Sequence, residues 1–346
     1  MVGPGGEVPS VFSPGSPEAH AIADLFGITL IICGVIFAVV AGLIAYAVVR
    51  FRSREGDAEP RQITGHTRLE IAWTLLPVAI LVGILTLTVR TMSAADPPAD
   101  REPDLVVIGH QWWWEVRYPA SGAVTANEIH VPVGRRLLVG VEAADVIHDF
   151  WVPELARKVD AVPGHPNHVW MTVTAPGTYL GACAEYCGAQ HAWMRIRVVA
   201  HTEADFEAWQ RREAAPAAAP HDEAAVRGAT LFREHTCVAC HAINQAAAPA
   251  GPITLQNDMG IDLATRQALG AAAVPTGEPP AARVAPDLTH LASRATLAAG
   301  AIENSPATLA RWLADPEAIK PSSHMPNLHL SSAQVSDLVA YFETLQ

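Results

Sequence analysis

The chain has 346 residues, and half of them are apolar, so it is long enough for two or three domains. Acidic residues outnumber basic ones by 35 to 23, for a formal net charge of −12, which argues against nucleic acid as a partner. Four of the five cysteines form two closely spaced pairs. Each pair lies in a motif with its own chemistry, so no disulfide framework is required. The fifth, Cys33, is predicted to be a packing residue.

Two long apolar segments follow a short N-terminal arm. Residues 1–20 are rich in Gly, Pro and Ser and are expected to be extended. The runs Ile28–Val49 and Ile71–Val89 carry no charge, and at about 1.5 Å per residue each can span a bilayer core of about 30 Å. Pro77 in the second run is tolerated in a membrane helix. We therefore predict a transmembrane hairpin over 21–96, with a pair of buried helices in a soluble core as the alternative.

The link between the two runs sets the expected orientation. It is rich in arginine, so the positive-inside rule places it in the cytoplasm and both chain ends outside. No positively charged segment precedes the first run, so a secretory signal of the usual kind is not predicted. The arginines of the link are Arg50, Arg52, Arg54, Arg61 and Arg68.

A β-sandwich is predicted over residues 103–200. Leu105–Ile108 has the composition of a strand and is followed by three tryptophans, Trp112–Trp114. Consecutive residues of a strand point to opposite faces, so at least one indole faces the core and another can stand exposed. Further strands are predicted near Glu128–Val131, Arg136–Val141 and His168–Thr174, with Gly and Pro supplying the turns.

The stretch 181–194, GACAEYCGAQHAWM, gathers metal-binding side chains. Cys183, Cys187, His191 and Met194 lie within it, with Glu185 between the cysteines. Thiolate and thioether are soft ligands and imidazole suits copper well, whereas zinc more often takes Cys-x2-Cys pairs and rarely methionine. The spacing therefore predicts copper, held on a loop between strands near 178–180 and 195–199.

One further ligand is expected earlier in the chain. His148, in VIHDFWVPEL, ends an apolar run, and a histidine at one strand end with a Cys/His/Met loop on another is the arrangement of a cupredoxin copper site. A disulfide between Cys183 and Cys187 is the alternative, but it would not require His148, His191 and Met194 at these positions. Other single histidines, such as His130 and His168, are predicted to be surface or core residues.

These two motifs resemble subunit II of haem–copper cytochrome c oxidase, where two cysteines bridge the two coppers of a centre called CuA. The resemblance implies that Cys183 and Cys187 bridge both ions. It implies also that Glu185 offers its backbone carbonyl to copper and its carboxylate to a magnesium or manganese ion near subunit I. The remaining ligands implied are His148, His191 and Met194.

The same resemblance suggests roles for three other residues. It makes Trp112 the residue through which electrons reach the copper, with Trp113 and Trp114 as packing residues. Glu70, in LEIAWTLLP, would mark the mouth of a proton channel into subunit I; alternatively it is a solvated charge favoured by the helix dipole. Asp160, in KVDAVPG, would lie close to subunit I, or is an ordinary turn acid.

A second redox domain is predicted after a linker. Residues 201–220 contain an amphipathic helix, Glu203–Glu213, and the low-complexity segment Ala214–Pro220. In the domain 221–346, Cys237-Val-Ala-Cys240-His241 is the attachment signature of c-type haem. Both thiols would form thioethers and His241 would bind the iron. A thioredoxin-like Cys-x-x-Cys is the alternative, but it gives His241 no role.

The second axial ligand of this haem is expected far along the chain. Met325 lies in SSHMPNLHL, before a predicted helix Ser331–Leu345 that starts with a Ser331/Gln334 capping box. Methionine opposite histidine raises the haem potential, which suits an electron carrier. The rival ligands are His324, His329 and Met259.

The C-terminal domain resembles class I cytochrome c. Gly228 and Tyr341 would meet where the first and last helices cross, and a further helix should begin at Ser305-Pro306. The segment Pro286–His290 follows the fused cytochrome of caa3-type oxidases. The sequence departs from that pattern at Gln245–Arg283, an Ala- and Pro-rich stretch without an assigned role.

Together these resemblances imply a multidomain chain: a membrane hairpin, an all-β cupredoxin-like Greek-key sandwich and an all-α class I cytochrome c. It would be subunit II of a caa3-type cytochrome c oxidase in the bacterial inner membrane, with both redox domains on the periplasmic side. Electrons from soluble cytochrome c or another donor would pass through haem c and CuA to subunit I, where O2 becomes water with proton translocation. Subunit III and the lipid membrane are further expected partners.

Four other functions would use part of this pattern. A CuA-containing nitric oxide reductase subunit uses the same copper module with a different catalytic partner. A membrane-anchored copper or thiol redox protein would work without any oxidase. A nitrous oxide reductase would need a histidine-rich domain, and quinol oxidase subunits lack the copper ligands present here.

Overall fold

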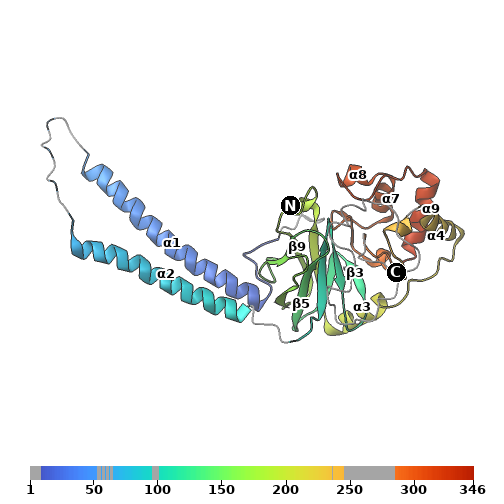
Figure 1. The fold of residues 1–346 in the computed structure, drawn as a ribbon, viewed down its shortest axis with the longest axis horizontal. Helices are drawn as coiled ribbons and strands as arrows, with labels where there is room; N and C mark the ends of the chain where they lie inside the picture. The colour runs from blue at the N-terminus through green and yellow to red at the C-terminus, as the bar shows by residue number, and fades with distance from the viewer. Residues whose placement is uncertain are drawn as a thin grey trace.

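The chain forms a long helical hairpin, a β-sandwich and a C-terminal helical domain, arranged in that order along the molecule (Figure 1). The computed structural model describes residues 9–52, 56, 59, 62, 65–95, 101–235, 237–244 and 285–346. The Ala- and Pro-rich stretch 245–283, which contains Met259, lies outside the described residues, as do residues 1–8 of the expected N-terminal arm.

Helices α1 (Pro17–Arg50) and α2 (Thr67–Ala95) form the hairpin, and both are long and apolar enough to cross a membrane. Most of their large apolar side chains are exposed, which is the surface a lipid bilayer would cover. α2 continues through Pro77. α1 starts four residues inside the arm expected to be extended, because Ser16 accepts a hydrogen bond from Ala19 N and Pro17 occupies the first turn.

The base of the hairpin is joined to the sandwich by polar contacts. Ser16 Oγ donates to Leu155 O at 2.5 Å. Arg136, at the start of strand β5, lies 3.2 Å from the Glu18 carboxylate of α1 and donates to Ala94 O of α2 at 3.3 Å. One side chain of the sandwich, Arg136, thus contacts both membrane helices and joins the sandwich to the base of the hairpin.

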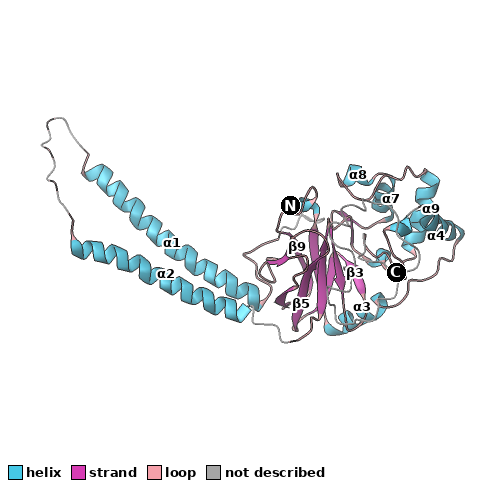
Figure 2. Ribbon diagram, viewed as in Figure 1, coloured by secondary structure: helices cyan, strands magenta, loops and turns pink. Residues whose placement is uncertain are grey.

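The predicted all-β sandwich is confirmed and consists of two five-stranded sheets (Figure 2). Fully buried Trp114, Phe150, Met171 and Ile196 fill its core. The chain changes sheets repeatedly, and β1 pairs with β5, and β4 with β10, in parallel. The first sheet has the order β3 (Val124–Ala126), β2 (Trp113–Arg117), β1 (Leu105–His110), β5 (Arg136–Ala143), β8 (Asn167–Thr172). The second has the order β4 (Glu128–Pro132), β10 (Arg195–His201), β9 (Gly177–Cys183), β6 (His148–Trp151), β7 (Val159–Ala161).

Helix α3 (Glu203–Glu213) places Phe206 and Trp209 against the sandwich core, and the C-terminal domain follows. Its first and last helices cross at Gly228, as predicted: a Cβ there would lie 2.7 Å from Tyr341 Cβ and still closer to Asp337 O. The Ser331/Gln334 capping box is also confirmed. A short hairpin was not predicted. The elements are α4 (Glu223–Glu234), β11 (Thr296–Leu297), β12 (Ile302–Glu303), α7 (Pro306–Ala314), α8 (Pro316–Ile319) and α9 (Ser332–Glu343).

Candidate metal and haem centres

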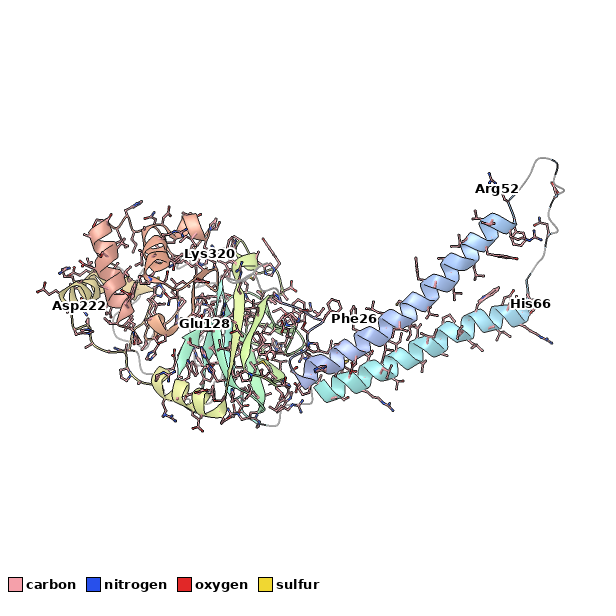
Figure 3. All side chains as sticks on the ribbon, turned by 180° about the vertical axis from the view of Figure 1, so that it is seen from behind. Phe26, Arg52, His66, Glu128, Asp222 and Lys320 are labelled. Carbon is pink, nitrogen blue, oxygen red and sulfur yellow. The ribbon has the colours of Figure 1, made fainter. Side chains whose placement is uncertain are left out.

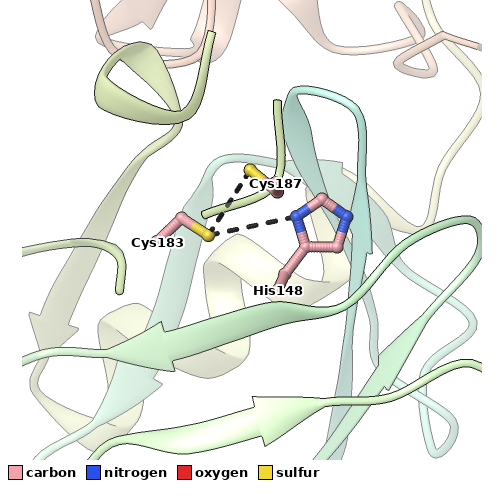
Figure 4. Close-up of side chains that lie close together, drawn as sticks. All are labelled: His148, Cys183 and Cys187. Carbon is pink, nitrogen blue, oxygen red and sulfur yellow. Dashed lines mark hydrogen bonds between the residues drawn. The ribbon is translucent and has the colours of Figure 1, made fainter. Parts of the chain in front are cut away.

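The two cysteines of the first pair lie at one end of the sandwich (Figure 4). Cys183 ends strand β9, and Cys187 lies in the loop that leads to the short helix His191–Trp193. Both side chains are buried, and their sulfur atoms are 3.7 Å apart. A disulfide bond would need about 2.05 Å, so the pair consists of free thiols that can both face a cation.

The other predicted ligands surround this sulfur pair. Cys183 Sγ lies 3.2 Å from Glu185 O and 3.9 Å from His148 Nδ1. Cys187 Sγ lies 3.7 Å from His191 Nδ1 and 3.9 Å from Met194 Sδ. The structure therefore brings all six residues together, with donor atoms on both sides of the two sulfurs. Such a soft, buried donor set fits a pair of copper ions bridged by thiolates.

The electrostatics of the site favour a metal cation. The thiol–thiol hydrogen bond with Cys187, together with those from His148 and backbone amides, lowers the pKa of Cys183 to about 3. The same hydrogen bond and burial raise the pKa of Cys187. Thiolate is the form that binds metals, so the lowered pKa of Cys183 favours a bound cation.

Asp145 is a functional residue that the sequence reasoning missed. Its Oδ1 lies 2.8 Å from His148 Nε2, and its Oδ2 accepts a hydrogen bond from Gln111 N at 2.7 Å. Burial would raise the pKa of Asp145, but these hydrogen bonds and that from Val146 N lower it. The carboxylate therefore fixes the imidazole so that Nδ1 faces Cys183, as carboxylates behind ligating histidines do.

We expect Asp145→Asn to weaken copper binding by about 10–100-fold, because a neutral amide orients the His148 ring less strongly. Competition with a copper chelator would measure the affinity. Asp205→Asn, on helix α3, is the matched control because the Asp205 carboxylate accepts a hydrogen bond from Thr202 at the start of its own helix. An unchanged affinity in Asp145→Asn would show that backbone packing alone orients the ring.

Trp112 connects the copper loop to the C-terminal domain. Its Nε1 donates to Cys187 O at 2.9 Å, and its ring lies 4.5 Å from that of His324, centroid to centroid. Gly188, at φ +118°, lets the loop approach this indole, since a Cβ there would lie 2.9 Å from Trp112 Cζ2. The expectation that this tryptophan can stand exposed is wrong: only 9% of it is accessible, because the C-terminal domain covers it.

The other two tryptophans pack as predicted. Trp114 is fully buried in the sandwich core. Trp113 stacks on His110, with centroids 4.2 Å apart, and contacts Ala126 and Ala299. Because Ala299 belongs to the hairpin loop of the C-terminal domain, Trp113 packs between the two domains.

Glu115 holds the strand after these tryptophans. Its carboxylate lies 3.1 Å from His110 Nε2 and accepts a hydrogen bond from Arg117 Nε at 2.7 Å. Burial would raise the pKa of Glu115, but the His110 hydrogen bond and the Arg117 charge outweigh it and lower the pKa to about 2. The ionised carboxylate is therefore part of the folded sandwich.

This depressed pKa predicts a pH dependence. The ionised Glu115 carboxylate stabilises the folded state fully above the ordinary pKa of 4.5, and this stabilisation is lost as the pH falls through about 2. In total it contributes up to about 3 kcal/mol to the free energy of unfolding. Glu115→Gln should therefore show a shallower loss of thermal stability between these pH values than the unsubstituted chain. Parallel pH profiles in both proteins would contradict this assignment.

The second cysteine pair lines an apolar cavity. Cys237, Cys240 and His241 lie on one wall and Met325 also lines it. His241 Nδ1 lies 2.8 Å from Pro286 O, which leaves Nε2 for iron and fixes the ring. These donors fit a c-type haem. Among the described residues, the rival His324 also lines the cavity, whereas His329 does not.

The C-terminal domain alone does not enclose this cavity. Part of its wall comes from the sandwich, through Gln111, Trp112, Trp113 and Gln190. The haem site and the copper loop therefore share Trp112, which was not evident from the separate motifs.

Glu70 lies away from both centres, whereas Asp160 lies next to the copper residues, because its strand β7 pairs with β6, which begins at His148. Glu70 Oε1 accepts a hydrogen bond from His66 N at 3.1 Å, and Leu69 N donates to His66 Nδ1 at 3.3 Å, so Glu70 and His66 together cap the exposed start of α2. Asp160 is exposed on β7, opposite Asp149. Both residues are accessible to a partner subunit.

These features define a membrane-anchored electron-transfer protein with a cupredoxin-like domain and a cytochrome c domain. Residues 11–89 and 123–201 match the sequence models of the transmembrane and periplasmic domains of cytochrome c oxidase subunit II, and residues 225–346 match that of cytochrome c. The cytochrome domain implies a c-type haem, and the subunit II domain implies CuA-type copper.

Whole-length relatives place the chain in one family. It is 30% identical to cytochrome c oxidase subunit 2 of Alkalihalophilus pseudofirmus, over 97% of this chain and 91% of that protein. It is 29% identical to the Bacillus subtilis protein of that name, over 97% and 92%. The periplasmic domain of subunit II of cytochrome oxidase of Bradyrhizobium japonicum is 32% identical over 33% of this chain and 96% of its own, with a TM-score of 0.31. The chain belongs to the cytochrome c oxidase subunit 2 family, with a fused cytochrome c domain, so the resemblance predicted from its motifs is confirmed.

Proposed function

We propose that this chain receives electrons for a caa3-type cytochrome c oxidase and delivers them to subunit I, where O2 is reduced to water with proton translocation. The main support is that one residue, Trp112, lies at both sites. It donates a hydrogen bond to the Cys187 carbonyl and lines the cavity of Cys237, Cys240 and His241. The haem and the copper pair, when bound, supply one-electron oxidation and reduction.

The haem residues are assigned as follows. Cys237 and Cys240 would hold the haem through their sulfur atoms, and His241 would bind the iron through the nitrogen that its hydrogen bond to Pro286 O leaves free. Met325, from the segment between α8 and α9, would be the second iron ligand, since it lines the same cavity. Val238 and Cys240 are exposed, so a soluble donor such as a cytochrome c can approach this edge.

The copper residues already lie together in the structure, and four of the six are buried: His148, Cys183, Cys187 and Met194. Cys183 and Cys187 would hold both ions, and His148, His191 and Met194, with the Glu185 carbonyl, would supply the other donor atoms. His148 and Met194 have no accessible surface, so this side of the shell excludes water and has little freedom to rearrange when the charge changes. The exposed Glu185 carboxylate would bind magnesium or manganese where the sandwich meets subunit I, close to Asp160.

The hairpin anchors both redox domains to the membrane. We place the arginine-rich link in the cytoplasm of a bacterium and the sandwich and cytochrome domain on the periplasmic side. Glu70, at the cytoplasmic start of α2, then marks the mouth of a proton path into subunit I, in addition to its capping contact. Subunit III is a further expected neighbour in the complex.

Analysis of the purified complex tests this proposal. We expect two copper ions and one covalently bound haem for each copy of the chain, and O2 consumption when a reduced soluble cytochrome c is supplied. Consumption of nitric oxide in place of O2 would identify a nitric oxide reductase. A reversible Cys183–Cys187 disulfide without haem would identify a thiol redox protein.

A further inference from the structure

Two of the polar contacts that the cytochrome domain makes with the sandwich involve buried side chains of the described residues. The first is made by Glu128, which begins strand β4 and is 2% exposed. Its Oε1 accepts hydrogen bonds from Thr296 N and Thr296 Oγ1, both at 2.7 Å, and its Oε2 accepts one from Ala295 N at 3.0 Å. The three donor atoms belong to Ala295 and Thr296, at the start of the β11–β12 hairpin, so one sandwich carboxylate binds the base of this hairpin.

The second contact is made by Gln190 and Lys320. Gln190 Nε2 donates to Lys320 O at 3.1 Å and to Pro321 O at 2.7 Å. In return, Lys320 Nζ donates to Trp112 O at 3.1 Å. Gln190 is 2% exposed and Lys320 5%. A lysine is seldom buried unless it is paired, so this contact is specific to the docked arrangement.

The two contacts flank the haem cavity. Thr296, Gln190 and Lys320 all line it, and so do Trp112 and His324, whose rings lie 4.5 Å apart. Figure 3 shows Glu128 and Lys320 where the sandwich meets the C-terminal domain. With a contact on each side of the cavity, the cytochrome domain is held against both sliding and rotation over Trp112.

We propose that Glu128, Gln190 and Lys320 form an interdomain latch that holds the cytochrome domain in a single orientation on the copper domain. This rests on the proposed function, in that the two domains carry the haem and the copper. The latch residues are positioning residues for the internal electron transfer. Because the docked domain covers Trp112, a soluble donor reduces the haem and has no direct route to the copper.

The latch fixes the orientation of the cytochrome domain, which the linker between the two domains does not. A flexible linker raises the effective concentration of the haem near the copper domain, but it sets no orientation. Electron transfer falls steeply with distance, so only a docked orientation gives a constant rate. Truncating one partner of a buried, hydrogen-bonded charge is a costly change at an interface, and Glu128 is such a charge with three donors.

The test uses the purified full-length chain in its complex. The haem is reduced by a light pulse, and copper reduction is followed by its near-infrared absorbance at increasing viscosity. We expect a viscosity-independent rate in the unsubstituted protein. In Glu128→Ala the rate should fall by at least about tenfold and become viscosity-dependent, because three donors lose their acceptor. In Glu128→Gln, which keeps one acceptor oxygen, the rate of copper reduction should lie between those of the unsubstituted protein and Glu128→Ala.

Two controls separate the latch from folding. Glu203→Ala removes an exposed carboxylate that pairs with Arg135 within the sandwich and should leave the rate unchanged. Lys320→Met independently removes the part of the second contact that Lys320 Nζ makes to Trp112 O, and it takes the place of Glu128→Ala if that variant fails to fold. Retention of the copper and haem absorption spectra shows that both domains of a variant are folded.

Hydrogen exchange provides a readout that does not depend on electron transfer. The amides of Ala295 and Thr296 should be protected in the unsubstituted protein and exchange faster in Glu128→Ala. If copper or haem is missing from the unsubstituted protein, the proposed function fails. If both are present, and Glu128→Ala changes neither the rate nor the exchange, the latch is overturned. A viscosity-dependent rate in the unsubstituted protein would also overturn it.

Discussion

Replacing Cys187 by serine is expected to abolish the mixed-valence copper spectrum and oxidase turnover together. Serine stays protonated and offers a hard oxygen, so the ions lose a bridging thiolate. Loss of a residue behind a metal ligand already costs about 10–100-fold in affinity, so loss of this bridge should cost more than about 100-fold. Copper analysis and electron paramagnetic resonance of the purified complex would measure both effects.

Cys33→Ser is the matched control for this experiment. Cys33 is an exposed thiol on the membrane helix α1, far along the chain from the copper loop, so its replacement should leave copper content and spectrum unchanged. Haem absorption should stay the same in both variants, since Cys237 and Cys240 are untouched. An unchanged copper spectrum in Cys187→Ser would remove Cys187 from the ligand shell and with it the dinuclear assignment.

That the six residues around the sulfur pair lie together could be predicted, because metal-binding side chains leave a local pattern in the sequence. Five of the six residues lie within a stretch of twelve, and only particular side chains bind copper. His148, 35 positions before Cys183, was found because cupredoxins take a histidine from a separate strand. Asp145 left no comparable signal, since an aspartate three residues before a histidine is common and only the fold shows that it holds the ring.

The docking of the two domains could not be predicted for a similar reason. Glu128 and Thr296 lie 168 positions apart, and neither residue type indicates its partner. The burial of Trp112 follows from the same docking, which explains why its exposure was predicted wrongly. The start of α1, in contrast, was readable in principle, since Ser16-Pro17 is an ordinary helix-start signal. The Gly-, Pro- and Ser-rich composition led to the prediction of an extended arm, so this helix start was not predicted.

Replacing Met325 by leucine is expected to lower the reduction potential of the haem strongly. Methionine ligation raises the potential of a c-type haem relative to other ligands, and Met325 lines the same cavity as His241. A fall of about 120 mV corresponds to about 100-fold in the equilibrium for a one-electron transfer. The soluble donor would then reduce the haem about 100-fold less favourably, while the copper potential stays the same. A redox titration followed by haem and copper absorbance would measure both.

His324→Leu distinguishes the two candidate ligands. His324 lines the cavity as well, but its ring lies against Trp112, so its loss should leave the haem potential unchanged and alter only the contact between the domains. A large fall in potential with His324→Leu, and none with Met325→Leu, would make histidine the second axial ligand. The haem would then have a low potential, and the internal transfer to copper would release more free energy at the expense of reduction by the external donor.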